Sequence, residues 1–129
     1  MPIPILLVDD DPLYREVMTA ALEERGYVVT SFADGPALLA ALEANIEASI
    51  EGKLALIDWT LPLMSGLELL HALRQRGWSL PVAFLTGRSP REREAEARAA
   101  GAVDFIDKTA DVDDLVGRLA RILGVAAPG

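Results

Sequence analysis

The sequence lacks several features, and each absence excludes a class of function. None of the 129 residues is cysteine, so disulfides, thiol catalysis and thiolate zinc sites are excluded. The only histidine, His71, falls within a predicted helix and is assigned to packing or the surface. No apolar run approaches the roughly 18 residues that a membrane-spanning helix needs, and the first residues lack the basic start of a signal peptide. We expect a cytoplasmic protein with no membrane contact.

Positive charge is also scarce. Lysine and arginine number 12 against 20 aspartates and glutamates, which gives a net charge of −8. Such a molecule is repelled by nucleic acid unless its basic residues are locally concentrated. The basic clusters in this chain are short, so we expect no direct contact with nucleic acid. The acidity does suit a protein that binds a divalent cation.

Short apolar runs alternate with amphipathic segments five times along the chain. The predicted strands are Ile3–Val8, Tyr27–Phe32, Leu54–Ile57, Val82–Leu85 and Val103–Ile106. The first, third and fourth are continuously apolar, as in strands that are covered on both faces. The fifth contains Asp104 and is predicted to lie at an edge. Strands that alternate with helices indicate right-handed βαβ units, and hence an α/β fold with a parallel sheet.

Capping residues mark where the predicted helices begin and end. The start signals are Asp11-Pro12, Asp34-Gly35-Pro36, Ser65 with Glu68, Ser89 with Pro90 and Glu92, and Asp111. The stop signals are Gly26, Gly77, Gly101 and Gly124. Apolar residues at intervals of four predict that the second helix is long and ends near Glu51. We expect one domain over residues 1–124, followed by a tail or linker stub over residues 125–129.

Polar residues follow four of the apolar strands. The first strand leads into Asp9, Asp10 and Asp11, the third into Asp58, the fourth into Thr86 and the fifth into Lys108. In an open parallel sheet, ligands bind beyond the carboxyl ends of the strands. Each residue alone is more simply explained as a helix cap, a turn former or a solvated lysine. Together they predict one site, because four separate strand ends each supply a suitable group.

This set of residues suits phosphoryl transfer. Clustered carboxylates raise one another's pKa values, and Mg²⁺, which prefers oxygen ligands, relieves their repulsion. A carboxylate is also a nucleophile toward phosphorus and gives an acyl phosphate. A metal, a lysine ammonium and a hydroxyl can neutralise the phosphoryl oxygens during the transfer.

Four segments resemble the signatures of the receiver domains of two-component response regulators. They are Leu6–Asp11, the phosphoacceptor segment Asp58–Gly66 with its proline and glycine, Phe84–Gly87, and Ala100–Ala102 together with Lys108. The resemblance covers essentially the whole chain, and the ordered set is far more specific than any one segment. It implies a flavodoxin-like, doubly wound (βα)5 sandwich with a parallel sheet in the strand order 2-1-3-4-5.

The resemblance implies a role for each residue of the predicted site. Asp58 would accept a phosphoryl group from a sensor histidine kinase or a phosphotransfer protein, and Lys108 would pair with Asp58 or its phosphate. Mg²⁺ would be held by Asp9, Asp10, Asp58 and the backbone carbonyl of Thr60. Thr86 and Phe105 would form the switch, although an aromatic residue on a strand is equally well explained as core. The domain would not be an enzyme beyond catalysing its own phosphorylation and dephosphorylation.

The chain departs from the family pattern at Thr109, which follows Lys108 where proline is usual and is often preceded by a cis peptide. A cis bond before a residue other than proline costs about 2.5–4 kcal/mol, so we expect a trans peptide and a reshaped loop. The direction of the Lys108 side chain stays open. The segment between the second and third strands is also long, which is expected to alter shape rather than chemistry.

The resemblance also implies an output surface on the fourth helix, fifth strand and fifth helix. This surface would bind an effector domain or downstream protein, or a second copy of the chain after phosphorylation. Some combination of Arg91, Arg93, Glu94, Asp104 and Asp113 is expected to form it.

Two other functions stay open. A phosphatase of the haloacid-dehalogenase type also uses an aspartate and Mg²⁺, and Asp9 with Asp11 has its Asp-x-Asp spacing, but Leu13 stands where that family has threonine or valine. A receiver-like interaction module that is never phosphorylated is the other alternative, which Thr109 keeps open. A calcium loop is excluded, because three consecutive aspartates lack its spacing.

Overall fold

The computed structural model describes residues 3–44, 53–87 and 91–124. It contains a five-stranded parallel sheet in the order β2-β1-β3-β4-β5. The strands are β1 (Ile3–Val8), β2 (Tyr27–Phe32), β3 (Leu54–Asp58), β4 (Val82–Thr86) and β5 (Asp104–Asp107). Each predicted strand is confirmed to within one residue at either end, and β5 lies at an edge as predicted.

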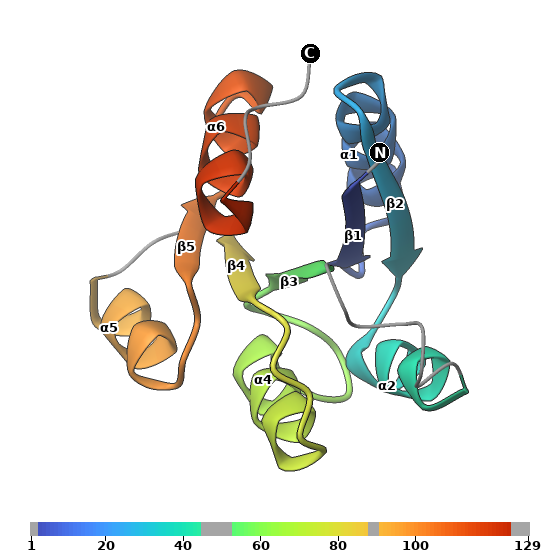
Figure 1. The fold of residues 1–129 in the computed structure, drawn as a ribbon. Coiled ribbons are helices and arrows are strands. Elements are labelled where there is room, and N and C mark those ends of the chain that lie inside the picture. Colours follow the sequence, from blue (N-terminus) through green and yellow to red (C-terminus); the bar gives the residue numbers. More distant parts are fainter. Residues whose placement is uncertain (1–2, 45–52, 88–90, 125–129) are drawn as a thin grey trace.

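Helices cover both faces of the sheet (Figure 1). On one face lie α1 (Pro12–Glu24) and α6 (Val112–Leu123), and on the other α2 (Gly35–Ala44), α4 (Gly66–Gln75) and α5 (Arg91–Ala99). This arrangement confirms the flavodoxin-like, doubly wound fold in the predicted strand order. Within the described ranges, none of these helices is long and apolar enough to span a membrane.

The core is divided by the sheet into two layers. Successive residues of β1 point to opposite faces, so Ile5 lies in one layer with Leu22 of α1 while Leu6 lies in the other layer with Leu38 of α2. Every residue of β3 and β4 is buried. The continuously apolar strands are therefore covered on both faces, as the sequence predicts.

The predicted helix signals are confirmed wherever they fall on described residues. The Asp11 carboxylate accepts the N–H groups of Leu13 and Tyr14 at 3.0 and 3.3 Å. Ser65 and Glu68 form the predicted capping box, and Asp34 and Asp111 cap α2 and α6. The stop glycines all have positive φ: Gly26, Gly77, Gly101 and Gly124. The signals at Ser89 and Pro90 and the extension of the second helix to Glu51 lie outside the described residues.

Gly66 brings the start of α4 against the end of β3. A Cβ atom at this position would lie 2.5 Å from the carbonyl oxygen of Asp58 and 2.9 Å from a ring carbon of Phe84. The N–H of Gly66 donates to the carbonyl of Trp59 at 3.1 Å. The absence of a side chain is therefore what allows the chain to fold back directly beneath Asp58.

Gly66→Ala is expected to destabilise the protein by about 1–3 kcal/mol, because the added methyl group must displace backbone atoms. Gly117→Ala is the matched control. A Cβ at Gly117, inside α6, would meet nothing within 4 Å, so this variant should gain about 0.5–1 kcal/mol. Urea unfolding followed by circular dichroism measures both values. A Gly66→Ala protein as stable as the parent would contradict the close approach.

Candidate functional site

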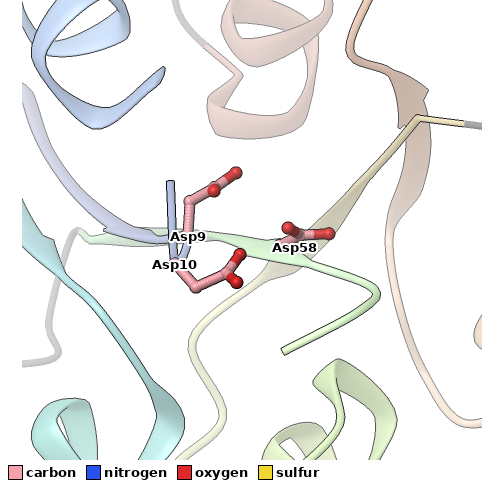
Figure 2. Close-up of side chains that lie close together, drawn as sticks. All are labelled: Asp9, Asp10 and Asp58. Atoms are coloured by element: carbon pink, nitrogen blue, oxygen red, sulfur yellow. The ribbon is translucent and has the colours of Figure 1, made fainter. Parts of the chain in front are cut away.

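The predicted site residues meet at one edge of the sheet. Asp9 and Asp10 directly follow β1, Asp58 and Thr86 are the last residues of β3 and β4, and Lys108 directly follows β5. Parallel strands end at the same edge, so residues up to 99 positions apart are brought together there. Figure 2 shows Asp9 and Asp10 extending from the end of β1 and Asp58 from the end of β3.

The three carboxylates form a cluster that suits a divalent cation. One oxygen from each of Asp9, Asp10 and Asp58 lies within 4.8 Å of the others. Asp9 and Asp58 are buried, whereas Asp10 is exposed. Mg²⁺ takes oxygen ligands and keeps several waters, so a cluster that is open on the Asp10 side has the chemistry and access that such an ion needs.

Lys108 lies between the two buried carboxylates. Its Nζ is 3.0 Å from Asp58 Oδ2 and donates a hydrogen bond to it. The same Nζ is 2.6 Å from Asp9 Oδ2, an ion pair whose angles fall outside hydrogen-bond geometry. The pairing with Asp58 was predicted from the sequence, but the pairing with Asp9 was not. One ammonium group therefore balances two carboxylates that the fold removes from water.

The electrostatics of the site reflect both burial and pairing. Burial raises the pKa of Asp58, although the hydrogen bonds from Lys108 and from the Thr60 N–H oppose this shift. Burial alone would lower the pKa of Lys108, but its close pairing with Asp9 and Asp58 raises the pKa overall. The lysine is therefore held in its charged form, and the carboxylates depend on that charge.

Backbone groups orient the two buried carboxylates. Asp58 Oδ1 accepts the N–H of Thr60 at 3.0 Å, and Asp9 Oδ1 accepts the N–H of Asp11 at 2.9 Å. The guanidinium of Arg15 donates to the carbonyl oxygen of Asp9 at 2.7 Å. Each carboxylate thus has one oxygen held by the main chain, and its other oxygen faces Lys108.

The loop after Lys108 has the predicted trans peptide, since no cis bond occurs in the described chain. Asp107 shapes the loop by accepting the N–H and the hydroxyl of Thr109 at 2.8 and 2.7 Å. These hydrogen bonds lower the pKa of Asp107. The N–H of Lys108 also donates to the carbonyl of Thr86 at 2.8 Å, so the lysine backbone is fixed to β4.

A cavity of about 480 Å³ opens over the cluster. It is lined by Asp10, Asp58, Thr60, Thr86, Gly87, Arg93 and Lys108. Arg93 was expected on the output surface, but the structure places its side chain at this cavity. Sequence spacing gave no signal for this, because which way an exposed helical side chain extends depends on its rotamer.

The aromatic residues next to the site form a small packed group. The ring of Trp59 lies edge-to-face with those of Phe84 and Phe105, at centroid distances of 5.1 and 5.5 Å. Phe105 is only 6% exposed. The structure therefore has Phe105 already packed inward, next to the residue that follows Asp58.

Tyr14 is a site residue that the sequence did not reveal. Lys108 Nζ lies 4.6 Å from the centroid of the Tyr14 ring. Tyr14 precedes Met18 and Leu22 at helical spacing on α1, so the pattern predicts only a core residue. The ring does pack against that core, but its position at the end of the helix also brings it to the site.

The remaining residues of the expected output surface are divided between two places. Asp104 pairs with Arg98 of α5 and Arg118 of α6 at 3.3 and 3.1 Å, which links β5 to both neighbouring helices. Glu94 pairs with the same Arg98. Asp113 instead pairs with Arg25 at the end of α1. The side chain of Arg91 lies outside the described residues.

Comparison with known proteins identifies close similarities. The chain matches the family described as the response regulator receiver domain over residues 5–120. It is 38% identical over 120 residues to the two-component response regulator PhoP of Pseudomonas aeruginosa, covering 92% of this chain and 51% of that protein. It is 33% identical over 122 residues to the probable transcriptional regulatory protein TcrX of Mycobacterium tuberculosis, covering 95% of this chain and 50% of TcrX.

A solved structure is similar over nearly its full length. The CheY-like response regulator receiver domain protein of Methanospirillum hungatei superposes with a TM-score of 0.81 at 31% sequence identity. The match covers 96% of this chain and 95% of that one. By contrast, this chain spans about half the length of the curated relatives described above.

Lys108→Met is expected to destabilise the metal-free protein by about 3 kcal/mol, because the buried Asp9 and Asp58 carboxylates lose their counter-charge. Mg²⁺ should restore more stability to this variant than to the parent. Urea unfolding in chelator and in Mg²⁺ measures the difference. Glu43→Gln is the control: it removes an exposed ion pair with Arg76 and should cost at most about 1 kcal/mol. Equal losses in the two variants would contradict the role given to Lys108.

Proposed function

Because the chain belongs to the response regulator receiver family of two-component signalling systems, we propose that Asp58 is its phosphoacceptor. The donor would be a phosphohistidine on a sensor histidine kinase or a phosphotransfer protein. The observation that carries this proposal is the setting of Asp58, which lies at a cavity with two other carboxylates and a lysine. The domain acts as a signalling switch and catalyses only its own phosphorylation and dephosphorylation.

The proposed reaction is a single phosphoryl transfer. An oxygen of the Asp58 carboxylate attacks phosphorus, the bond from phosphorus to the histidine nitrogen breaks, and the imidazole takes up a proton. The product is an acyl phosphate. Lys108 lies 3.0 Å from Asp58 Oδ2 and can neutralise charge on the oxygens of the transferred group. Thr86 lines the same cavity and is proposed to donate its hydroxyl to one of those oxygens.

The carboxylate cluster is proposed to hold Mg²⁺ through Asp9, Asp10 and Asp58, together with the backbone carbonyl of Thr60. The fit rests on the donor set, which consists of hard oxygen ligands within 4.8 Å of one another. A bound Mg²⁺ supplies positive charge to the phosphoryl oxygens. The chain's own contribution is to keep Asp58 oriented by the Thr60 N–H and to supply the lysine.

The readout of phosphorylation is proposed to use Thr86, Phe105 and the surface formed by α5, β5 and α6. Phe105 pairs with Phe84, which lies two residues before Thr86 on β4. Side chains two residues apart on a strand share a face of the sheet, so a movement of Thr86 is proposed to alter the packing around Phe105. The ion pairs of Asp104 with Arg98 and Arg118 connect that strand to the surface. The partner at this surface would be an effector domain, a downstream protein or a second copy of the chain.

The domain is proposed to comprise residues 1–124, with residues 125–129 as a tail or linker. TcrX, described as a probable transcriptional regulatory protein, is about twice as long as this chain's match to it. That relationship favours an output step in gene regulation, carried out by a partner or by a further domain rather than by this one. A cytoplasmic location, which the absence of cysteine suits, is part of the same proposal.

Asp58 suits the nucleophile role better than Asp9, which the phosphatase alternative would use. Asp9 is fully buried and is absent from the residues lining the cavity, whereas Asp58 lines it. A nucleophile must face the phosphorus atom that it attacks. The geometry therefore favours a phosphorylated switch over a phosphatase of the haloacid-dehalogenase type.

Incubation with Mg²⁺ and acetyl phosphate is expected to give one phosphoryl adduct by intact mass. Asp58→Asn should abolish the adduct, and a chelator should prevent it. Asp104→Asn is the control, because it changes an aspartate on β5 outside the site and should still be labelled. A parent that gains no adduct, even from candidate kinases, would favour the non-phosphorylated interaction module. Repeated turnover of a phosphomonoester would favour the phosphatase.

A further inference from the structure

Among the described residues, the Lys108 ammonium interacts with two carboxylates and with one uncharged group, the ring of Tyr14. Asp9 Oδ2 lies at 2.6 Å, Asp58 Oδ2 at 3.0 Å, and the centroid of the Tyr14 ring at 4.6 Å. The face of an aromatic ring carries negative charge density and attracts a cation within about 6 Å. The ring of Tyr14 is therefore close enough to bind the ammonium group.

The two charged neighbours of Lys108 are also candidate metal ligands. Asp9 and Asp58 each contribute an oxygen to the carboxylate cluster. A divalent cation bound there repels the ammonium group and competes with it for the same oxygens. Tyr14 offers no such ligand, because burial raises the pKa of its hydroxyl to about 12 and the phenol stays neutral at ordinary pH. Among the described neighbours of the ammonium group, the Tyr14 ring is therefore the one that would not also bind the metal.

The placement of Tyr14 does not depend on the Asp9 and Asp58 carboxylates that pair with Lys108. It stands in the first turn of α1, where its N–H donates to the Asp11 cap. Its ring packs on the core layer beneath α1 and α6. Tyr14 thus brings a rigid aromatic face to Lys108 from an element that is anchored by a cap and by core packing.

We propose that Tyr14 is a positioning residue whose ring holds the Lys108 ammonium beside Asp58 when a divalent cation occupies the carboxylate cluster. The inference rests on the proposed function, which supplies the metal and the phosphoryl group. It also accounts for how Lys108 can be directed without a following proline. Asp107 shapes the backbone beyond Lys108, and Tyr14 directs the side chain.

The environment of the pair favours a strong contact. The Lys108 side chain is 21% exposed, and Tyr14 is partly buried. A contact between a cation and an aromatic face stabilises a protein more when water is excluded from it. Such a contact changes the equilibrium constant for unfolding by about threefold to thirtyfold. Phenylalanine presents a similar face, so Tyr14→Phe should preserve the contact. Tyr14→Leu keeps an apolar side chain but removes the ring.

The first test is a double-mutant cycle on stability in saturating Mg²⁺. The parent, Tyr14→Leu, Lys108→Met and the double variant are unfolded in urea. A second cycle with Tyr14→Phe in place of Tyr14→Leu is the matched control. The unfolding equilibrium constants should show a coupling of about threefold to thirtyfold for Tyr14→Leu with Lys108→Met, and much less for Tyr14→Phe. Additive effects for both substitutions would overturn the inference. This readout does not require phosphorylation of the protein.

The second test is the rate of labelling by acetyl phosphate in saturating Mg²⁺. Tyr14→Leu should slow labelling by about threefold to thirtyfold, while Tyr14→Phe should label nearly as fast as the parent. In the Lys108→Met background, Tyr14→Leu should cause no further slowing. Equal slowing by Tyr14→Leu with and without Lys108 would overturn the positioning role. If the parent itself is never labelled, the proposed function fails, and the stability cycle still decides whether Tyr14 holds Lys108.

Discussion

The ion pairing of one lysine with two buried aspartates is the interaction on which the rest of the site depends. Burying an unpaired carboxylate is costly, yet the aspartate that follows β1 and the aspartate that ends β3 are both almost fully covered. Lys108 compensates both charges from the end of β5. In the sheet, β4 lies between β5 and β3. The lysine side chain therefore extends across the end of β4 to reach the carboxylates. The charges of the site are therefore compensated only if the strand order and register bring these three strand ends together.

This arrangement also sets how the site can respond to ligands. Lys108 places one positive charge beside Asp9 and Asp58, next to the position proposed for a divalent cation. The proposed cation would compete with the ammonium group for the same carboxylate oxygens, which would lower the affinity of the site for the cation. The phosphoryl group proposed on Asp58 would add negative charge, which Lys108, the proposed cation and Arg93 at the cavity would each help to neutralise. In the proposed phosphorylated form, the lysine and the metal would share the charge of the carboxylates and the phosphoryl group.

The fold and most of the site could be predicted from the sequence, for identifiable reasons. Strand ends and helix starts follow from local patterns, such as the apolar run before Asp58 or the Asp11-Pro12 cap, and parallel strands then force the chemistry to one edge. What could not be predicted depends on side-chain direction. The helical spacing of Tyr14 with the apolar residues of α1 is the same whether or not its ring reaches Lys108. The position of Arg93 on an exposed helix is likewise the same whether its side chain turns toward the output surface or the cavity. Hydrophobic spacing does not specify rotamers.

The junction of Lys108 and Thr109 shows how a departure from a family pattern can be accommodated. Without proline, the loop uses the Asp107 side chain to hold Thr109, and the peptide stays trans. The lysine backbone is tied to β4 through Thr86, so the start of the side chain is placed by the sheet. Its end is placed by the Tyr14 ring and two carboxylates. Phe105, three residues earlier, is already packed inward. The proposed readout through Phe105 would therefore change how its ring packs against Trp59 and Phe84, not move it in from solvent. The ion pairs of Asp104 would carry that change to α5 and α6.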